Sequence, residues 1–410
     1  MYPIVSFLLF LFLPALLLAL PIVELGVDRF FKENYAQKLQ GKKIGLITNQ
    51  TGVNSELKST IDLFCEPGRP FTLTALFAPE HGIHGQAYAA EKSDQIQHYR
   101  GIPVYSLYGQ NSRPSDAMLE GIDLLIFDIQ DIGCRSYTYV STLCSIMEVA
   151  AAKKIPLYIL DRPNPINGLT VDGPMLSPDH RSFLAYLDIP YCYGMTIGEL
   201  ARYFNAEYQI GCPLTIVPLN GWKRSMTFAD TGLTWIPPSP QIPEADTPFF
   251  YASTGILGEL GIANIGVGYT LPFKVVGAPW INAEIFAEKL NVQHLSGVHF
   301  IPFHYRPFFG SFKSQNCQGV KILITDPLLY RPLSVQYLIL GMLKSLYPQK
   351  FQEKLAALEP LKKKLFCQVS GNSEMLTLIS QEKYIAWKLI DFQKEERAAF
   401  LKKREKYLLY

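Results

Sequence analysis

The sequence predicts a doubly wound α/β domain followed by a second domain in which helix and strand signals are mixed. Two observations support this prediction. From Lys42 onward, short apolar runs alternate with helix-like stretches, and a proline-rich segment at residues 235–243 then interrupts the pattern. Alternation of this kind is typical of a parallel sheet covered by helices on both faces. A chain of 410 residues is also too long for one ordinary core.

Six segments are predicted to be strands, because each is a short apolar run bounded by polar or turn-forming residues. They are residues 44–48, 73–77, 104–107, 124–129, 157–160 and 214–217. Helices are clearest over residues 143–154 and 196–208, where Thr196 and Glu199 form a capping box at the start of the second helix. Strands and helices therefore alternate in the order that a doubly wound sheet requires.

The domain boundary is predicted within the proline-rich segment. Its prolines exclude regular helix and central strand, since each removes a hydrogen-bond donor and fixes φ. We therefore assign residues 23–235 to the first domain and residues 236–410 to the second. Within the second domain, glycines space residues 254–268, and a charged helix at about residues 381–406 is expected to face solvent.

The N-terminus predicts export. Residues 4–20 are apolar apart from Ser6 and Pro14, which is typical of the core of a signal peptide. No basic residue precedes this run and no clear cleavage site follows it, so residues 1–22 are expected to be a signal peptide or an N-terminal anchor. The run is short for a membrane span. The expected location is periplasmic or extracellular, with a membrane tether through residues 4–20 as the alternative to cleavage.

Composition and motifs exclude several classes of function. The formal net charge of +2 gives no basic field for a nucleic-acid partner. The first predicted strand is not followed by a dinucleotide fingerprint or a phosphate loop, and the chain has no Gly-x-Ser-x-Gly elbow, so we expect no nucleotide cofactor and no serine nucleophile. The seven scattered cysteines are expected to be mostly small buried hydrophobic residues, with at most one or two disulfides.

Polar residues follow four of the predicted strands. Ligands bind beyond the carboxyl ends of strands in open α/β sheets, so these residues are candidates for a site. Asp and Asn also end strands for structural reasons, because they suit turns and caps. Four such ends on one rim nevertheless predict a polar site. The residues are Asn49, Gln50 and Thr51; Glu80, His81 and His84; Asp128, Gln130 and Asp131; and Asp161, Arg162 and Asn164.

Glu80 is the leading candidate for chemistry. Pro79 and Gly82 hold it on a stiff turn, where a side chain can be aimed rather than left mobile. A general acid or base, partly desolvated by Phe77, Pro79 and Tyr88, is the functional interpretation. A glutamate that caps a helix or pairs with arginine is the structural one. Asp128 comes after the apolar residues 124–127, so its carboxylate is expected to emerge at the edge of the core, where it could position Glu80, contact a substrate hydroxyl or cap its own turn.

Two further interpretations concern metal and sugar ligands. Glu80, His81 and His84 together suggest a metal-dependent hydrolase, but they lie on a loop and no other cluster supplies a clear third ligand, so we expect no metal. Aromatic residues make up 13% of the chain, and several of them, including Tyr137 and Tyr251, lie near the candidate loops or the boundary. Such side chains suit stacking on sugar rings as well as ordinary packing.

Several motifs resemble those of the NamZ-type exo-β-N-acetylmuramidases. They are GLITNQTG (45–52), ALFAPEHGIHG (75–85), PVYSLYG (103–109), FDIQDIG (127–133), LDRPNPING (160–168), GMTIGELA (194–201), PPSP (237–240) and GAPWI (277–281). The resemblance runs from about Gly26 into the C-terminal half. It implies a Rossmann-like N-terminal domain and a smaller α+β C-terminal domain, with the site in the cleft between them. It also implies release of N-acetylmuramic acid from the non-reducing end of peptidoglycan fragments, so peptidoglycan-derived sugars or muropeptides are the expected partners.

The resemblance makes Glu80 the catalytic position. The second catalytic group is expected to be Asp128, Glu259 or the N-acetyl group of the substrate. The residues expected to bind or orient substrate are Asn49, Thr51, His81, Gln130, Arg135, Tyr137, Asp161, Arg162, Asn164 and Glu259.

The chain departs from the family pattern at one loop. Where the pattern has a charged Glu-Gly-Arg-Gly segment, this sequence has Ile265-Gly266-Val267-Gly268. Loss of an acid and an arginine there keeps open the alternative of a non-catalytic sugar- or muropeptide-binding protein. A metal-dependent hydrolase that uses Glu80, His81 and His84 is a second alternative, independent of this loop.

Overall fold

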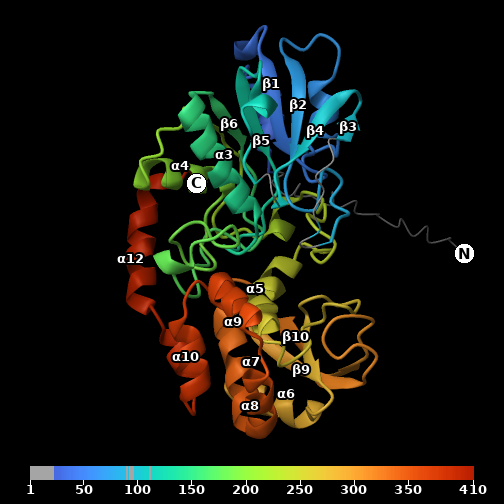
Figure 1. Cartoon of the computed structure of the whole chain (residues 1–410), viewed down its shortest axis with the longest axis vertical. Coiled ribbons are helices and arrows are strands. Elements are labelled where there is room, and N and C mark those ends of the chain that lie inside the picture. Colours follow the sequence, from blue (N-terminus) through green and yellow to red (C-terminus); the bar gives the residue numbers. More distant parts are fainter. Residues whose placement is uncertain (1–22, 89–90, 92–96, 110–111) are drawn as a thin grey trace, which may run out of the picture.

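The computed structural model describes residues 23–88, 91, 97–109 and 112–410. Figure 1 shows two bodies stacked along the long axis, an α/β body that carries the larger sheet and a smaller body built from the C-terminal part of the chain. The predicted fold class is confirmed: a mostly parallel sheet with helices is joined to a smaller domain with helices and an antiparallel sheet. The predicted signal peptide or anchor at residues 1–22, including the possible tether through residues 4–20, lies outside the described residues.

The larger sheet has seven strands in the order β3-β4-β2-β1-β5-β6-β7. All neighbouring strands are parallel except β3 and β4. Its strands are β1 (Lys43–Thr48), β2 (Thr72–Ala78), β3 (Gln97–Tyr99), β4 (Ile102–Ser106), β5 (Leu124–Asp128), β6 (Leu157–Leu160) and β7 (Leu214–Val217). All six predicted strands are present. Strand β3 was not predicted, because it is a short and largely exposed edge strand without an apolar run. It turns into β4 through Arg100 and Gly101 at positive φ.

Helices cover both faces of this sheet. They are α1 (Gly26–Lys32), α2 (Thr60–Phe64), α3 (Tyr139–Lys153) and α4 (Ile197–Glu207). The predicted capping box is present, because the Thr196 hydroxyl accepts from the Glu199 amide and the Glu199 carboxylate accepts from the Thr196 amide. Helix α3 begins four residues before the predicted start at residue 143. This places its N-terminus close to the loop that follows β2.

The smaller domain has a three-stranded antiparallel sheet in the order β8-β10-β9. Its elements are α5 (Thr247–Glu259), β8 (Val275–Ala278), α6 (Ala283–Asn291), β9 (Val298–Tyr305), β10 (Cys317–Ile324), α7 (Pro332–Leu346), α8 (Pro348–Ala356), α9 (Pro360–Ser370), α10 (Glu374–Gln381), α11 (Ala386–Asp391) and α12 (Lys394–Arg404). The glycine-spaced segment 254–268 is thus helical in its first part, since α5 includes Gly255 and Gly258.

The largest hydrophobic core continues from the first domain into the second. It contains Leu143 of α3, Phe249 and Ile256 of α5 and Leu340 of α7, all of which are buried. A separate core cluster lies under α1 and α2, where Phe30 and Phe64 stack. The boundary predicted at residue 235 stays a prediction, because a shared core does not divide the chain at one residue.

The prediction of one solvated helix over residues 381–406 is wrong. The segment breaks twice, at Glu382, which has an extended backbone, and at Gln393, which has a positive φ of 54°. Its charged residues are also not all exposed. Arg404 is buried, and its guanidinium donates to the carbonyl of Tyr193 at 3.1 Å. The interleaved charges therefore include a residue that binds the first domain.

The C-terminal segment crosses back to the first domain. Figure 1 shows α12 running alongside both bodies and the C-terminus lying near α4. The hydroxyl of Tyr410 donates to Asp161 Oδ2 at 2.7 Å and accepts from the Leu219 amide at 2.7 Å, and the Leu409 amide donates to Glu199 Oε1 at 2.8 Å. The last residues of the chain therefore complete a polar network at the end of β6.

Replacing Tyr410 by phenylalanine is expected to destabilise the fold. The change leaves Asp161 and the Leu219 amide each without one partner, which costs about 1–3 kcal/mol for a partly buried group. Urea unfolding would show this as a lower midpoint with an unchanged slope. Tyr384→Phe is the matched control, because Tyr384 is 69% exposed. Equal midpoints for the Tyr410 and Tyr384 variants would contradict the expectation.

The cysteines match the expectation drawn from the sequence. All seven cysteines are free, and every one except Cys65 is buried, as expected for small hydrophobic residues. Cys134 and Cys192 lie opposite each other in an isolated antiparallel bridge.

Among the described residues, no helix has both the length and the apolar character needed to cross a bilayer.

Candidate functional site

A cavity of about 530 Å³ lies between the two domains. Its first wall comes from the loop after β2 and from the N-terminus of α3. Its second wall comes from α5, the 263–267 loop, residues 310–311 and α9. This volume is within the usual range for a small-molecule site, roughly 300–1,000 Å³. Because the loop after β2 forms part of its first wall, the cavity lies at the carboxyl end of the sheet, where α/β folds bind ligands.

Glu80 points into this cavity from the first wall. It is the second residue after β2, and only 8% of its surface is exposed. The Thr138 hydroxyl, at the N-terminus of α3, donates to Glu80 Oε2 at 2.6 Å. Tyr108 also hydrogen-bonds Glu80, and burial together with the Glu80 charge raises the pKa of Tyr108 to about 12. Two hydroxyl groups therefore fix the orientation of this carboxyl group.

His81 lies next to Glu80 on the same wall. Its φ of 72° is in the left-handed region, which is uncommon for a residue with a side chain and is often associated with functional sites. The Nδ1 atom lies 2.8 Å from the carbonyl oxygen of Ala87. A carbonyl can only accept, so Nδ1 carries the hydrogen and Nε2 is the acceptor of the neutral ring. His81 is thus held in one tautomer beside Glu80.

The structure does not bring His84 to the cavity. This residue is exposed, and its ring lies against Tyr99 with the centroids 5.7 Å apart. Across the described part of the chain, no group of three His, Cys, Asp or Glu side chains is arranged to hold a metal ion. The interpretation of Glu80, His81 and His84 as metal ligands therefore has no support in the geometry.

Glu259 faces the cavity from the second wall. It is near the C-terminal end of α5, and burial raises the pKa of its carboxyl group while the charge of Lys362 acts in the opposite direction. Tyr251 lies earlier on the same helix, and charged groups on both walls act on its hydroxyl group. Burial is the main cause that raises the pKa of Tyr251, and the charges of Glu259 and Glu80 add to it. Two carboxyl groups from different domains therefore face one cavity.

Asp128 was a candidate catalytic residue, but the structure places it away from this cavity. Its side chain is completely buried. Arg162 Nε donates to Asp128 Oδ1 at 2.6 Å, and the Thr60 hydroxyl donates to its other oxygen. Arg162 also donates to the Val53 carbonyl at 2.8 Å. Because both oxygens of Asp128 already have protein partners, its position indicates a structural role in joining β5 to neighbouring loops.

Asp161 is likewise turned into the protein. It is completely buried and accepts from the Thr196 hydroxyl at 2.7 Å, the Gly198 amide at 2.8 Å and the Tyr410 hydroxyl. Burial raises its pKa to about 7, and these donors oppose the rise. Its location anchors the start of α4 and the C-terminus. Asp161 does not line the cavity.

The other predicted binding residues divide into those that line the cavity and those that do not. His81, Tyr137 and Glu259 line the cavity with Glu80. Arg135 does not, because it is fully buried and donates to the carbonyls of Pro174, Ile189 and Ser370. Four further predicted binding residues make hydrogen bonds to neighbouring loops or side chains. They are Asn49, Thr51, Gln130 and Asn164.

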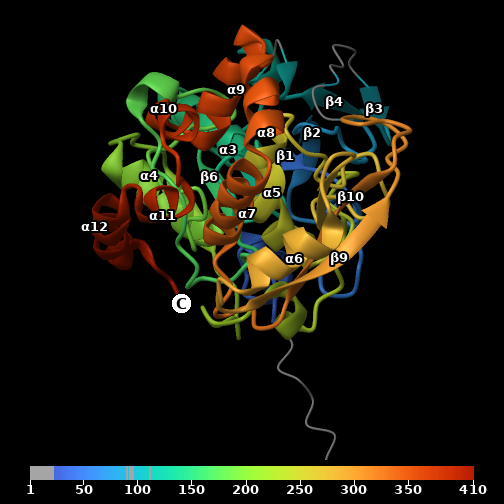
Figure 2. The same cartoon turned by 90° about the horizontal axis from the view of Figure 1, so that it is seen from below.

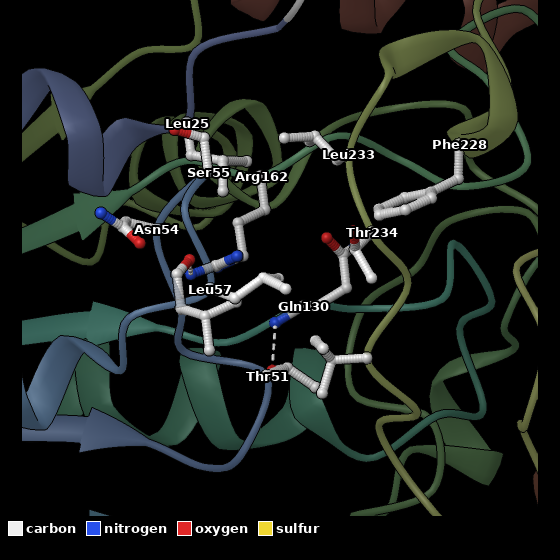
Figure 3. A pocket seen from close by; sticks show the side chains of 12 residues that line it. Leu25, Thr51, Asn54, Ser55, Leu57, Gln130, Arg162, Phe228, Leu233 and Thr234 are labelled. Carbon is white, nitrogen blue, oxygen red and sulfur yellow. Dashed lines mark hydrogen bonds between the residues drawn. The ribbon is translucent and has the colours of Figure 1, made fainter.

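Thr51, Gln130 and Arg162 border a separate hollow beside the sheet (Figure 3). The Gln130 amide donates to the Thr51 hydroxyl at 2.9 Å across it. The hollow measures about 20 Å³, which is enough for about one water molecule. It is too small for a sugar ring, so the inter-domain cavity is the candidate active site.

Thr138 and Lys362 are functional residues of the cavity region that were not predicted from the sequence. Thr138 was overlooked because α3 was predicted to begin later, although a threonine before a helical run is a recognisable cap signal. Lys362 lines the cavity from α9. In the sequence it stands in a run of three lysines, which is more typical of a solvated face, so no local signal separates it from its neighbours.

Comparison with known proteins gives consistent matches along the whole described chain. The family model described as exo-beta-N-acetylmuramidase NamZ, N-terminal, matches residues 44–246, and the corresponding C-terminal model matches residues 249–410. The chain is 39% identical over 391 residues to the peptidoglycan beta-N-acetylmuramidase NamZ of Bacillus subtilis (strain 168), covering 95% of this chain and 92% of that protein.

Two crystal structures from Bacteroides fragilis NCTC 9343 share the fold. Both are described as DUF1343 family proteins, and each match covers 95% of this chain and 99% of the other. One is 41% identical with a TM-score of 0.87, and the other is 26% identical with a TM-score of 0.73.

Proposed function

Because this chain belongs to the exo-β-N-acetylmuramidase NamZ family, we propose that its inter-domain cavity releases terminal N-acetylmuramic acid from peptidoglycan fragments. The observation that carries the proposal is the pair of carboxyl groups, Glu80 and Glu259, which face one cavity from its two walls. Most glycosidases use two carboxyl groups on either side of the bond that they cleave. The glycosidase chemistry of the family is thus assigned to Glu80 and Glu259 of this chain.

Glu80 is the group that we assign to proton transfer. Thr138 and Tyr108 hold its carboxyl group, so that it can deliver a proton to the glycosidic oxygen as the bond breaks. Glu259 is assigned to the opposite side of the sugar. There its charge stabilises the positive charge that develops on the ring in the transition state. His81 adjoins Glu80 and supplies an acceptor, Nε2, for a substrate hydroxyl.

Lys362 is the residue that we assign to recognition of the muramic acid. Among the described residues that line the cavity, it supplies the lysine or arginine charge. N-acetylmuramic acid differs from N-acetylglucosamine by a lactyl ether that ends in a carboxylate. A lysine at the cavity wall gives this carboxylate a partner, so it favours the muramic acid over the uncharged sugar.

The proposal is tested by turnover of two chromogenic glycosides, one of N-acetylmuramic acid and one of N-acetylglucosamine. The wild-type protein is expected to hydrolyse the first and to keep its activity after treatment with a chelator. A well-folded protein that binds muropeptides and hydrolyses neither glycoside would instead be a sugar-binding protein. Chelator-sensitive turnover would favour a metal-dependent hydrolase.

Replacing Lys362 by glutamine is expected to raise KM for the muramic acid glycoside about five-fold, as for a solvent-exposed ion pair. The acid limb of the kcat/KM profile should also move to higher pH. Lys362 lowers the pKa of Glu259, so its removal raises that pKa, and Glu259 then loses its charge at a higher pH as the solution is acidified.

Lys363→Gln provides the control, because Lys363 is the next residue of the same exposed helix but does not line the cavity. Its KM and its pH profile should match those of the wild type. If the Lys362 and Lys363 variants behave alike, Lys362 does not recognise the carboxylate.

Export of the chain remains part of the proposal. It is supported by the apolar run at residues 4–20 and by the location of peptidoglycan outside the cytoplasmic membrane. Mass spectrometry of the protein recovered from its native host would test it. An N-terminus after residue 20 indicates a cleaved signal peptide, and an intact N-terminus in the membrane fraction indicates the tether.

A further inference from the structure

Two exposed phenylalanines directly precede two residues that line the cavity. Phe308 is 65% exposed and Phe309 is 47% exposed, on the loop that joins β9 to β10. The next two residues of this loop, Gly310 and Ser311, line the cavity itself. Figure 2 shows the β9 and β10 hairpin on the side of the molecule where β3 and β4 lie. The aromatic surface is therefore continuous with the candidate active site.

The loop is held in place by the segment that departs from the family pattern. The Phe308 amide donates to the Gly268 carbonyl at 2.6 Å, and Asn264 Nδ2 donates to the Ser311 carbonyl at 3.0 Å. Gly268 has a φ of 88°, and a Cβ there would lie 2.1 Å from the carbonyl oxygen of Phe309. A side chain at this position would displace the loop. The 265–268 segment thus fixes where the two phenylalanines stand.

An aromatic stack supports Phe308 from below. Its ring lies 6.1 Å from that of Tyr269, with the two planes inclined by 30°. Tyr269 in turn packs on Tyr305 at 5.2 Å and on Phe303 at 6.4 Å. Phe308 is consequently a supported ring with an exposed face. A flat, supported aromatic face is suited to the apolar C–H face of a sugar ring.

The position of the cleaved bond indicates which sugars of the substrate would reach Phe308 and Phe309. An enzyme that removes the terminal residue of a glycan holds that residue in the cavity, and the rest of the glycan must extend out of the cavity. Tyr88, which is 68% exposed and lines the cavity from the other wall, adds an exposed aromatic side chain on that wall. The sugars that follow the cleaved bond therefore pass between aromatic side chains of the two domains.

Resting on the proposed function, we propose that Phe308 and Phe309 form a subsite for the sugar rings beyond the cleaved bond of a peptidoglycan glycan chain. This subsite binds the part of the substrate that is not released as the monosaccharide. It makes the enzyme prefer glycan chains over small glycosides, and it does so without any charged contact.

The test compares one small and one long substrate. For Phe308→Ala and for the double variant Phe308→Ala/Phe309→Ala, KM for peptide-free glycan strands is expected to rise about ten-fold, which corresponds to the loss of about one aromatic contact. KM and kcat for the chromogenic muramic acid glycoside should stay unchanged, since that substrate does not reach the loop. Phe308→Trp should restore the KM for strands.

Two further measurements separate this inference from the proposed function. Tyr384→Ala removes an equally exposed aromatic ring near α10, away from the mouth, and should change neither KM. Strand binding to the Glu80→Gln background, measured by calorimetry, needs no turnover. If wild type hydrolyses nothing, the proposed function fails, yet weaker strand binding in the phenylalanine variants still supports the subsite. Equal strand binding with and without the two rings overturns it.

Discussion

Glu80→Gln is expected to reduce kcat for the chromogenic muramic acid glycoside by about 100-fold to 10,000-fold, the usual contribution of a positioned general acid. The amide keeps the shape of the side chain and can still accept from Thr138, but its N–H groups are not acidic enough to protonate the glycosidic oxygen. KM should change little, because the cavity keeps its lining. Steady-state kinetics with the purified full chain measures both quantities.

Two controls make this result specific to chemistry. The thermal midpoint of Glu80→Gln should equal that of the wild type, which excludes misfolding as the cause of the loss. Thr138→Val removes one hydroxyl that orients Glu80 without removing the carboxyl group, so its loss of kcat should be smaller. Full activity in Glu80→Gln would remove Glu80 from the mechanism.

Asp128→Ala is expected to lower the free energy of unfolding by about 3–5 kcal/mol, because it leaves the buried Arg162 charge without its carboxylate. The Arg162 Nε and Asp128 Oδ1 atoms are 2.6 Å apart, and the two side chains are 4% and 0% exposed. Urea unfolding measures the effect. At a temperature where the variant remains folded, its kcat should be close to that of the wild type, since Asp128 does not line the cavity.

The double variant Asp128→Ala/Arg162→Met is the matched control. Removing the unpaired charge together with its partner should recover much of the lost stability, because the cost arises from the orphaned guanidinium. A stable but inactive Asp128→Ala would show instead that this aspartate takes part in catalysis, as its position at the carboxyl end of β5 first suggested.

The strands of the first domain were predictable because the sheet is buried on both faces. Each strand is then a nearly continuous apolar run, as in residues 124–128, and the next residues are polar wherever the strand ends. Glu80 could be found on the same ground, since Pro79 and Gly82 mark a stiff turn. Edge strand β3 could not, because it buries too little to need an apolar pattern.

The other polar residues at the strand ends show where such reasoning stops. Asp128, Asp161 and Arg162 have the residue types of a site, but a buried rim also needs partners for its own polar groups, and these residues bind one another and their neighbouring loops. Sequence does not show which way each side chain turns. Nor does it show that Lys362 comes to lie opposite Glu80, because that depends on how the two domains pack.

The return of the chain end to the first domain has a consequence for synthesis. Domains commonly begin to fold as they leave the ribosome, starting from the N-terminus. Here the Tyr410 hydroxyl donates to Asp161, which lies 249 residues earlier in the sequence. A nascent chain can form the seven-stranded sheet first, but the hydrogen bonds at the end of β6 can close only once Tyr410 has emerged from the ribosome.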